Sequence, residues 1–232
     1  MELLLIYPIG ELTSVNVGIL KMSIIKMLSS HELKVTGELP YKILSELCTG
    51  TTPEQFKKVS IVDSNRILFT AWKQTHCASE YIAKVACECG ATNLVRHQIK
   101  TDYTKPDIYD RVHQIECVDM EKPGSTKVYE IRLAQPMLKT QVSGVLSTLF
   151  EEERDDDALL DEFIWAHIKS IDGKTDFDRE SVPIPLYRKA TELTVDDGKK
   201  LDAMISVTVP CVKCKNDVTS TLSWYDAQFL QG

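Results

Sequence analysis

The 232-residue sequence is poor in glycine and lacks the common glycine-rich and catalytic motifs. Its ten glycines are scattered, and neither a phosphate-binding GxxxxGK[ST] loop nor a dinucleotide-binding GxGxxG segment is present. The zinc-protease motif HExxH and the nucleophile motif GxSxG are missing as well. These absences exclude the nucleotide-binding and hydrolase classes that such motifs define, and we expect a protein that is not an enzyme.

Long hydrophobic runs and an excess of basic residues are also missing. No stretch approaches the roughly 18–20 apolar residues of a membrane-spanning helix, and the apolar start lacks the basic residues of a signal peptide. The net charge is −7, whereas a protein that follows a phosphate backbone needs a basic surface. We therefore expect an intracellular protein that has neither a membrane nor a nucleic acid as its partner.

Cysteines are the most informative residues of the chain. Their number, seven, is odd, and nothing indicates secretion, which argues against a disulfide framework. Three are isolated and are expected to be small buried residues: Cys48, Cys77 and Cys117. The other four form two close pairs: Cys87 with Cys89, and Cys211 with Cys214.

The close pairs suggest a structural zinc site, which needs four ligands and often takes them in pairs from tight turns. Cys211-x-x-Cys214 has the usual spacing, whereas Cys87-x-Cys89 is one residue shorter and fits less well. One hypothesis is that both pairs share a single zinc ion that locks the two halves of the chain together. A second hypothesis is a local site made of His76, Cys77, Cys87 and Cys89. A third is that no metal binds and the cysteines are evolutionary relics or core residues.

Hydrophobic periodicity predicts an α+β fold of two lobes, each with helices packed on a small antiparallel hairpin. The hairpins are zinc-ribbon-like, because a cysteine pair lies at each bend. Their expected strands are Ser79–Ala86 with Thr92–Ile99, and Ser206–Val209 with Val218–Ser223. We place the lobe boundary after residue 125, with residues 1–125 as the N-terminal lobe and 126–232 as the C-terminal lobe.

Several elements outside the hairpins can be predicted from capping and periodicity. The opening segment around Tyr7 is expected to be a strand, and Asp63 to be the N-cap of a helix. Further helices are expected over Pro136–Phe150, Asp156–Ile171 and Thr194–Ile205. The segment 100–126 is polar and is expected to be irregular.

The C-terminal end carries large apolar residues: Trp224, Tyr225, Phe229 and Leu230. Chain ends usually fray unless something holds them. These side chains either dock on the protein's own second hairpin or contact a partner protein, where aromatic residues are enriched. We treat them as candidate partner-binding residues.

The order of features along the chain resembles the baseplate protein family of T-even-type phages, which comprises hub subunits and a hub-assembly factor. The family's Tyr-x-x-x-Val-x-Cys-Pro-x-Cys-Gly hairpin is similar to Tyr81–Gly90, which has one residue fewer between the cysteines. Other similar segments follow in the same order: Tyr7-Pro8, Lys21–Ile25, Ile43–Cys48, Asp63–Leu68, Ile131–Leu133, Ile168–Gly173, Cys211–Cys214, and the aromatic Trp224 and Phe229. The resemblance spans nearly the whole chain.

This resemblance implies a structural or assembly role in the phage tail baseplate, near the hub, without catalysis. Its partners would be other phage tail and baseplate proteins, and its location the virion, with the host cytoplasm as the place of assembly. Three alternatives remain: a hub-assembly chaperone that leaves the particle, a zinc-ribbon module that binds nucleic acid or a polymerase, and an enzyme that uses His76 and Cys77.

Overall fold

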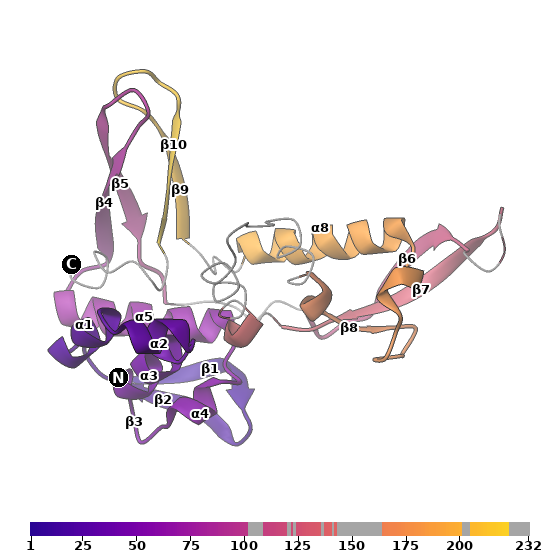
Figure 1. Cartoon of the computed structure of the whole chain (residues 1–232), viewed down its shortest axis with the longest axis horizontal. Coiled ribbons are helices and arrows are strands. Elements are labelled where there is room, and N and C mark those ends of the chain that lie inside the picture. Colours follow the sequence, from indigo (N-terminus) through magenta and orange to yellow (C-terminus); the bar gives the residue numbers. More distant parts are fainter. Residues whose placement is uncertain are drawn as a thin grey trace. The chain divides into compact units, whose positions relative to one another are not determined.

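A computed structural model of the chain describes residues 1–101, 109–119, 122, 124–135, 137–140, 142, 164–200 and 205–222. The chain divides into two compact units, Met1–Thr104 with Asp202–Gly232, and Lys105–Leu201. Helices and small antiparallel sheets occur in both units (Figure 1), so the expected α+β class is confirmed. The units differ from the expected division after residue 125, because the second cysteine hairpin belongs to the same unit as the first.

The first unit begins with a three-stranded antiparallel sheet and a group of short helices. The strands, in sheet order, are β1 (Glu2–Ile9), β2 (Leu12–Val17) and β3 (Cys48–Thr49). The helices are α1 (Met22–Leu28), α2 (His31–Val35), α3 (Leu39–Leu47) and α4 (Pro53–Phe56). Every second side chain of β1 is buried, which is the pattern of a strand with one face on the core. The expected N-terminal strand is confirmed.

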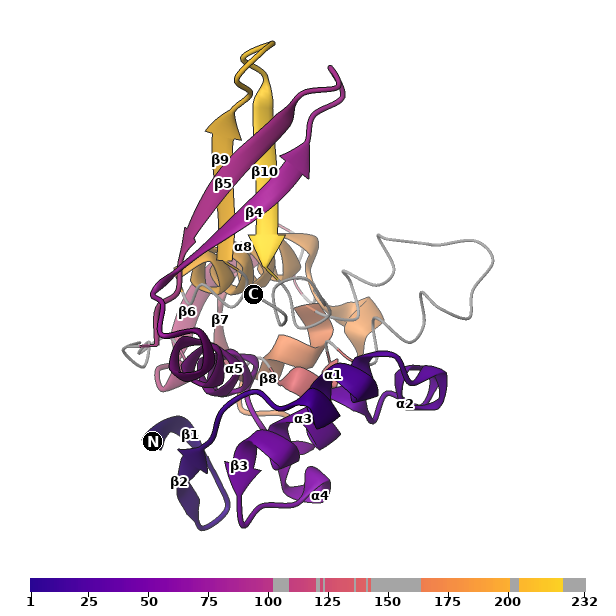
Figure 2. The ribbon, with the colours of Figure 1, turned by 90° about the vertical axis from the view of Figure 1, so that its left-hand side faces the viewer.

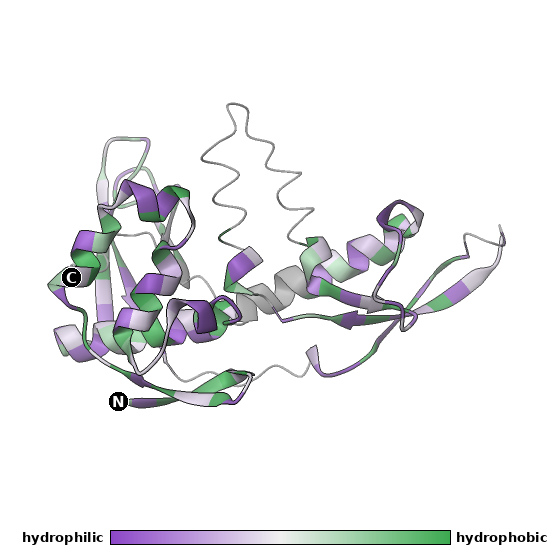
Figure 3. Cartoon of the chain, turned by 60° about the horizontal axis from the view of Figure 1, so that its bottom comes forward, coloured by the Kyte–Doolittle hydropathy of each residue, from purple (hydrophilic) through white to green (hydrophobic). Residues whose placement is uncertain are grey.

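Helix α5 (Ile61–His76) is the most buried helix of the first unit. All of its residues from Ile61 to Trp72 are buried, so this part of the helix is covered on every side. Ser60 caps it, since the Ser60 hydroxyl accepts the N–H of Asp63 at 3.0 Å. The expectation that Asp63 is the N-cap is therefore wrong, because Asp63 lies inside the first turn. Hydrophobic and hydrophilic stretches alternate along the helices of this unit (Figure 3).

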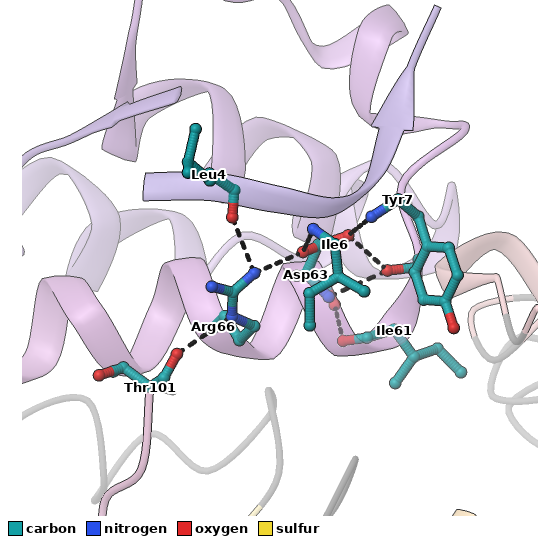
Figure 4. Close-up of polar contacts among 9 residues, drawn as sticks. Leu4, Ile6, Tyr7, Ile61, Asp63, Arg66 and Thr101 are labelled. Carbon is teal, nitrogen blue, oxygen red and sulfur yellow. Dashed lines mark hydrogen bonds and ion pairs between the residues drawn. The ribbon is translucent and has the colours of Figure 1, made fainter. Parts of the chain in front are cut away.

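Asp63 and Arg66 join α5 to β1 through buried polar contacts (Figure 4). The Asp63 carboxylate accepts the backbone N–H groups of Ile6 and Tyr7, each at 2.8 Å. Arg66 Nη1 donates to Asp63 Oδ1 at 3.0 Å and to the carbonyl oxygen of Leu4 at 2.8 Å. Since β1 is an edge strand, these side chains satisfy backbone groups that would otherwise need another strand or water.

Two β-hairpins also belong to the first unit. Their strands are β4 (Glu80–Ala86) with β5 (Thr92–Gln98), and β9 (Ile205–Pro210) with β10 (Asp217–Leu222). Each pair is antiparallel and in continuous register, so both predicted hairpins are confirmed. The hairpins pack on each other, with β5 against β9 and β4 against β10 (Figure 2). Between them, His97 Nε2 and Ser220 Oγ form a buried hydrogen bond of 2.8 Å.

Among its described residues, the second unit contains a small antiparallel sheet and the helix α8 (Ile184–Lys200). The strands, in sheet order, are β6 (His113–Val118), β7 (Thr126–Leu133) and β8 (Ile168–Ile171), all antiparallel. A short 3-10 helix, Arg179–Ser181, precedes α8 (Ile184–Lys200), which packs on β6 and β7. The core between them contains Tyr129, Ile131, Leu133, Ile168, Leu186 and Ala190. In the part of the chain that the structure describes, no helix is both long and apolar enough to cross a membrane.

Three expectations for the second unit are wrong. β6 lies in the segment that was expected to be irregular, and β8 occupies the end of the helix expected over Asp156–Ile171. The helix expected to begin at Thr194 begins ten residues earlier, at Ile184. Short apolar runs fit a helix and a strand equally well, and a capping-box-like pattern also occurs inside helices. Most of the helix expected over Pro136–Phe150 lies outside the described residues.

Candidate metal centre

Four cysteine side chains meet where the two hairpins of the first unit turn. Cys87 and Cys89 lie between β4 and β5, and Cys211 and Cys214 lie between β9 and β10. Their sulfur atoms are all within 4.8 Å of one another. The pairs Cys87–Cys214 and Cys89–Cys211 cross between the hairpins, with 3.6 Å between the two Sγ atoms of each pair. The cysteine pairs therefore come together, as the hypothesis of a shared site requires.

The first turn is closed by two backbone hydrogen bonds. Gly90 N donates to Cys87 O at 2.9 Å, and Cys87 N donates to Ala91 O at 2.8 Å. Gly90 has a φ of 80°, in the left-handed region that glycine enters without the steric cost of a side chain. A glycine directly after Cys89 thus lets the chain reverse into β5 within a very short turn.

The second turn reaches the same geometry with one more residue. Cys211 N donates to Asn216 O at 2.8 Å, and Lys215 N donates to Cys211 O at 3.1 Å. Lys215 follows the second cysteine as Gly90 does in the first turn, and it is also left-handed, with a φ of 67°. The Cys-x-Cys spacing therefore does not prevent a shared metal site. The shorter turn closes the same pattern of hydrogen bonds one residue earlier.

The sulfur distances fit one tetrahedral ion. A metal–sulfur bond of about 2.3 Å places the sulfurs of a tetrahedral site roughly 3.8 Å apart. The two sulfur–sulfur distances across the hairpins are 3.6 Å, well beyond the disulfide bond length of about 2.05 Å. All four cysteines are free thiols, and the four sulfurs could hold one metal ion.

Hydrogen bonds affect the thiols of this cluster unequally. The backbone N–H groups of Cys214 and Lys213 favour the Cys211 thiolate and, against the effect of burial, lower the pKa of Cys211 to about 6. At Cys87 the backbone N–H of Cys89 favours the thiolate, but burial and the neighbouring thiols raise the pKa to about 12. Four sulfurs at this spacing cannot all be anionic without a cation between them. A divalent metal would replace the protons that the thiols otherwise retain.

The remaining cysteines differ in exposure. Cys48 is buried in β3, and burial raises its pKa to about 12. Cys117 is buried in β6 and belongs to the core of the second unit. Cys77 is exposed and ends α5 in a left-handed conformation with a φ of 50°. The expectation of small buried residues is confirmed for Cys48 and Cys117 and is wrong for Cys77, because that residue caps the exposed end of a helix.

The alternative local site with His76 and Cys77 is not formed. Among the residues that the structure describes, the only group of three or more candidate ligands is the cysteine cluster of the hairpins. The His76 ring packs on Trp72, with 4.8 Å between ring centroids. Cys77 Sγ lies 3.9 Å from the carbonyl oxygen of Gln74. Both side chains thus belong to the end of α5.

One residue at the site has no metal-ligand signature in the sequence. Asn93 on β5 is buried, and its Oδ1 accepts the backbone N–H of Val212, next to Cys211, at 2.9 Å. The only sequence signal for it is a polar residue at an inward-facing strand position shortly after Cys89. Periodicity alone assigns such a position to an apolar side chain.

The candidate partner-binding residues at the C-terminus lie outside the described residues: Trp224, Tyr225, Phe229 and Leu230. Their role therefore stays a prediction.

Comparison with known proteins gives no relative. No protein-family model, no curated protein and no solved structure matches the chain.

Proposed function

We propose that the four cysteines bind one structural Zn²⁺ ion, and that the protein is a non-enzymatic component of a contractile phage tail baseplate. It would act in the hub region through protein–protein contacts. The meeting of Cys87 and Cys89 with Cys211 and Cys214 carries the metal part of this proposal. The order of motifs along the chain, which resembles the T-even baseplate family, supports the biological part.

Zinc suits this set of donor atoms best. Tetrahedral sites made only of thiolates hold zinc or iron, whereas magnesium and calcium prefer oxygen. Four protein ligands leave no coordination position for water or substrate, which is the pattern of structural zinc sites. Cys211 is fully buried and the other three cysteines are half-buried. The ion would therefore be enclosed by the two turns and would serve stability, not catalysis.

The ion would join segments that are far apart in the sequence. Cys89 and Cys211 are 122 positions apart, and the second unit, Lys105–Leu201, lies between them in the chain. Binding both turns would hold together the two parts of the first unit that this insertion separates in the sequence. Structural zinc binds small zinc-finger peptides with roughly 10–16 kcal/mol, and this free energy appears as folding free energy. The zinc site would therefore contribute strongly to the stability of the first unit.

The charge of the chain favours protein partners. A net charge of −7 repels polyanions such as nucleic acids and keeps the free protein soluble before assembly. We infer that the two units present surfaces of fixed shape to other tail and baseplate proteins. The protein would do so in the host cytoplasm during assembly and in the virion afterwards.

Two measurements test the proposal. Elemental analysis of protein purified without chelators should find one zinc per chain, and less than roughly half an equivalent would overturn the metal part. Quantitative mass spectrometry of purified phage particles should find the chain at a fixed ratio to hub proteins. Absence from particles, with abundance in the infected lysate, would favour the assembly-chaperone alternative. Retention of nucleic acid in a low-salt filter-binding assay would favour the nucleic-acid-binding alternative.

A further inference from the structure

Strand β5 directs every second side chain toward the interior of the first unit. Its buried positions are Asn93, Val95 and His97. Asn93 is the one nearest the cysteine turn, and only 1% of its surface is exposed. A buried amide must find partners for both its oxygen and its nitrogen, because an unsatisfied polar group costs about 1–3 kcal/mol.

Both ends of the Asn93 amide contact the turn of the other hairpin. Its Oδ1 accepts the backbone N–H of Val212 at 2.9 Å. Its Nδ2 donates to Cys211 Sγ at 3.7 Å, and it also lies 3.5 Å from the carbonyl oxygen of Ala91. One side chain of the first hairpin therefore holds a metal-ligand sulfur of the second hairpin and the peptide group beside it.

We propose that Asn93 is a positioning residue of the metal centre, which holds the second turn and the Cys211 sulfur in the geometry that the ion requires. The inference rests on the proposed zinc site. In metal sites, groups that hydrogen-bond to a ligand fix its orientation and tune its donor strength. Here Oδ1 fixes the position of the turn through Val212, and the Nδ2–H group acts on the sulfur itself.

A second polar contact between the hairpins offers a matched control. His97 Nε2 and Ser220 Oγ, both buried, are 2.8 Å apart. Ser220 lies three residues beyond Asp217 on β10, which places it about 10 Å from the start of that strand. Ser220→Ala therefore removes a buried contact between the same hairpins, but away from the sulfur cluster.

The Zn²⁺ affinity of the full chain, measured by competition with a chromophoric chelator, tests the inference. Asn93→Ala removes both contacts and should weaken the affinity by about 10–100-fold, the usual effect of losing such a supporting group. Asn93→Asp keeps an acceptor for the Val212 N–H but places an anionic oxygen beside the sulfur. It should weaken the affinity at least as much as Asn93→Ala. Ser220→Ala should leave the affinity unchanged.

Co²⁺ provides a readout that a loss of packing alone does not change. Thiolates bound to Co²⁺ give a sulfur-to-metal charge-transfer absorption, whose energy depends on the electron density at sulfur. Both Asn93 variants remove the N–H donor to Cys211, so this band should shift relative to the wild type. The band of Ser220→Ala should stay in place.

Three outcomes would overturn the inference. The first is wild-type affinity together with an unshifted Co²⁺ band in both Asn93 variants. The second is an equal loss of affinity in Ser220→Ala, which would assign the effect to hairpin packing. The third is a wild-type chain that binds neither Zn²⁺ nor Co²⁺, which would overturn the zinc site as well. Because Asn93→Asp keeps the contact with Val212, it remains informative even where Asn93→Ala does not fold.

Discussion

Replacement of Arg66 by methionine tests the buried ion pair that joins α5 to β1. The Asp63 side chain is 0% exposed and the Arg66 side chain 10%. Besides Asp63, Arg66 donates to the carbonyl oxygens of Leu4, through Nη1, and Thr101, through Nε. Arg66→Met keeps an apolar stem but removes all of these donors. It leaves Asp63 as a buried carboxylate without its positive partner.

The expected cost follows from the contacts that are lost. Removing one partner of a buried ion pair costs about 3–5 kcal/mol, and each buried carbonyl left without a donor costs about 1–3 kcal/mol. Asp63 still accepts hydrogen bonds from Ile6, Tyr7 and Ser60, which favours the lower end of the first range. The Thr101 carbonyl is buried and the Leu4 carbonyl is partly buried, so the total loss should be about 4–5 kcal/mol. That loss equals much of the 5–15 kcal/mol that stabilises a typical protein.

Urea unfolding followed by far-UV circular dichroism measures this loss, with Arg66→Lys as the comparator. Lysine keeps a positive charge near Asp63 but cannot reach both carbonyls with a rigid fork of donors, so about 1–3 kcal/mol should be lost. Amide hydrogen exchange of Ile6 and Tyr7 should accelerate in Arg66→Met, because both amides donate to the Asp63 carboxylate. A loss below about 1 kcal/mol in Arg66→Met, or one no larger than in Arg66→Lys, would refute the reasoning.

Three further results are expected. EDTA, or the substitution Cys214→Ser, should lower the unfolding midpoint of the first unit, whereas Cys77→Ser should not. Free Zn²⁺ at about 100 times its Kd adds about 2.7 kcal/mol to the free energy of unfolding. An unfolding midpoint that EDTA does not change would contradict the zinc site. In the native protein a thiol-alkylating reagent should modify exposed Cys77 and spare Cys48, because burial raises the pKa of Cys48 to about 12. Peptide mass spectrometry measures the labelling, and equal labelling of the two cysteines would contradict the burial of Cys48. Partial burial alone would raise the pKa of Asp172, but a backbone N–H and the ion pair with Lys127 lower it. The stability advantage of the wild type over Asp172→Asn should therefore be present above pH about 4 and vanish as the pH falls through the lowered pKa. Urea titrations at several pH values measure the difference in free energy of unfolding between the wild type and Asp172→Asn. A difference that does not change with pH would argue against the ion pair of Asp172 with Lys127.

The local parts of the metal centre could be predicted from the sequence. Alternation and a tight turn are local properties, so the strands on either side of Cys87 and Cys211 were correctly predicted. The short Cys-x-Cys spacing could not be judged from the sequence, because its effect depends on the left-handed Gly90 and on a matching left-handed Lys215. The association of the hairpins was one of three open hypotheses, because strands distant in the sequence leave no periodic signal of their packing partner.

The errors in the second unit have a related cause. Ile168–Ile171 forms an edge strand of a sheet whose other strands lie far upstream. A four-residue segment with an isoleucine at each end fits a helix as well as a strand, and the nearby helical pattern decided the prediction. The tertiary partner, β7, overrides that local preference.

Asp63 and Asn93 show where reasoning from hydrophobic patterns fails in this protein. Both are buried polar residues, and both satisfy backbone groups of a segment that is distant in the sequence: β1 for Asp63 and the second cysteine turn for Asn93. A pattern method assigns polar residues to caps or to the surface, because it measures only the local alternation of polarity. The partner that makes burial favourable is invisible to it. Such residues are matched to one particular neighbour, so they specify which distant segments meet, whereas the apolar residues around them only favour burial against any apolar surface.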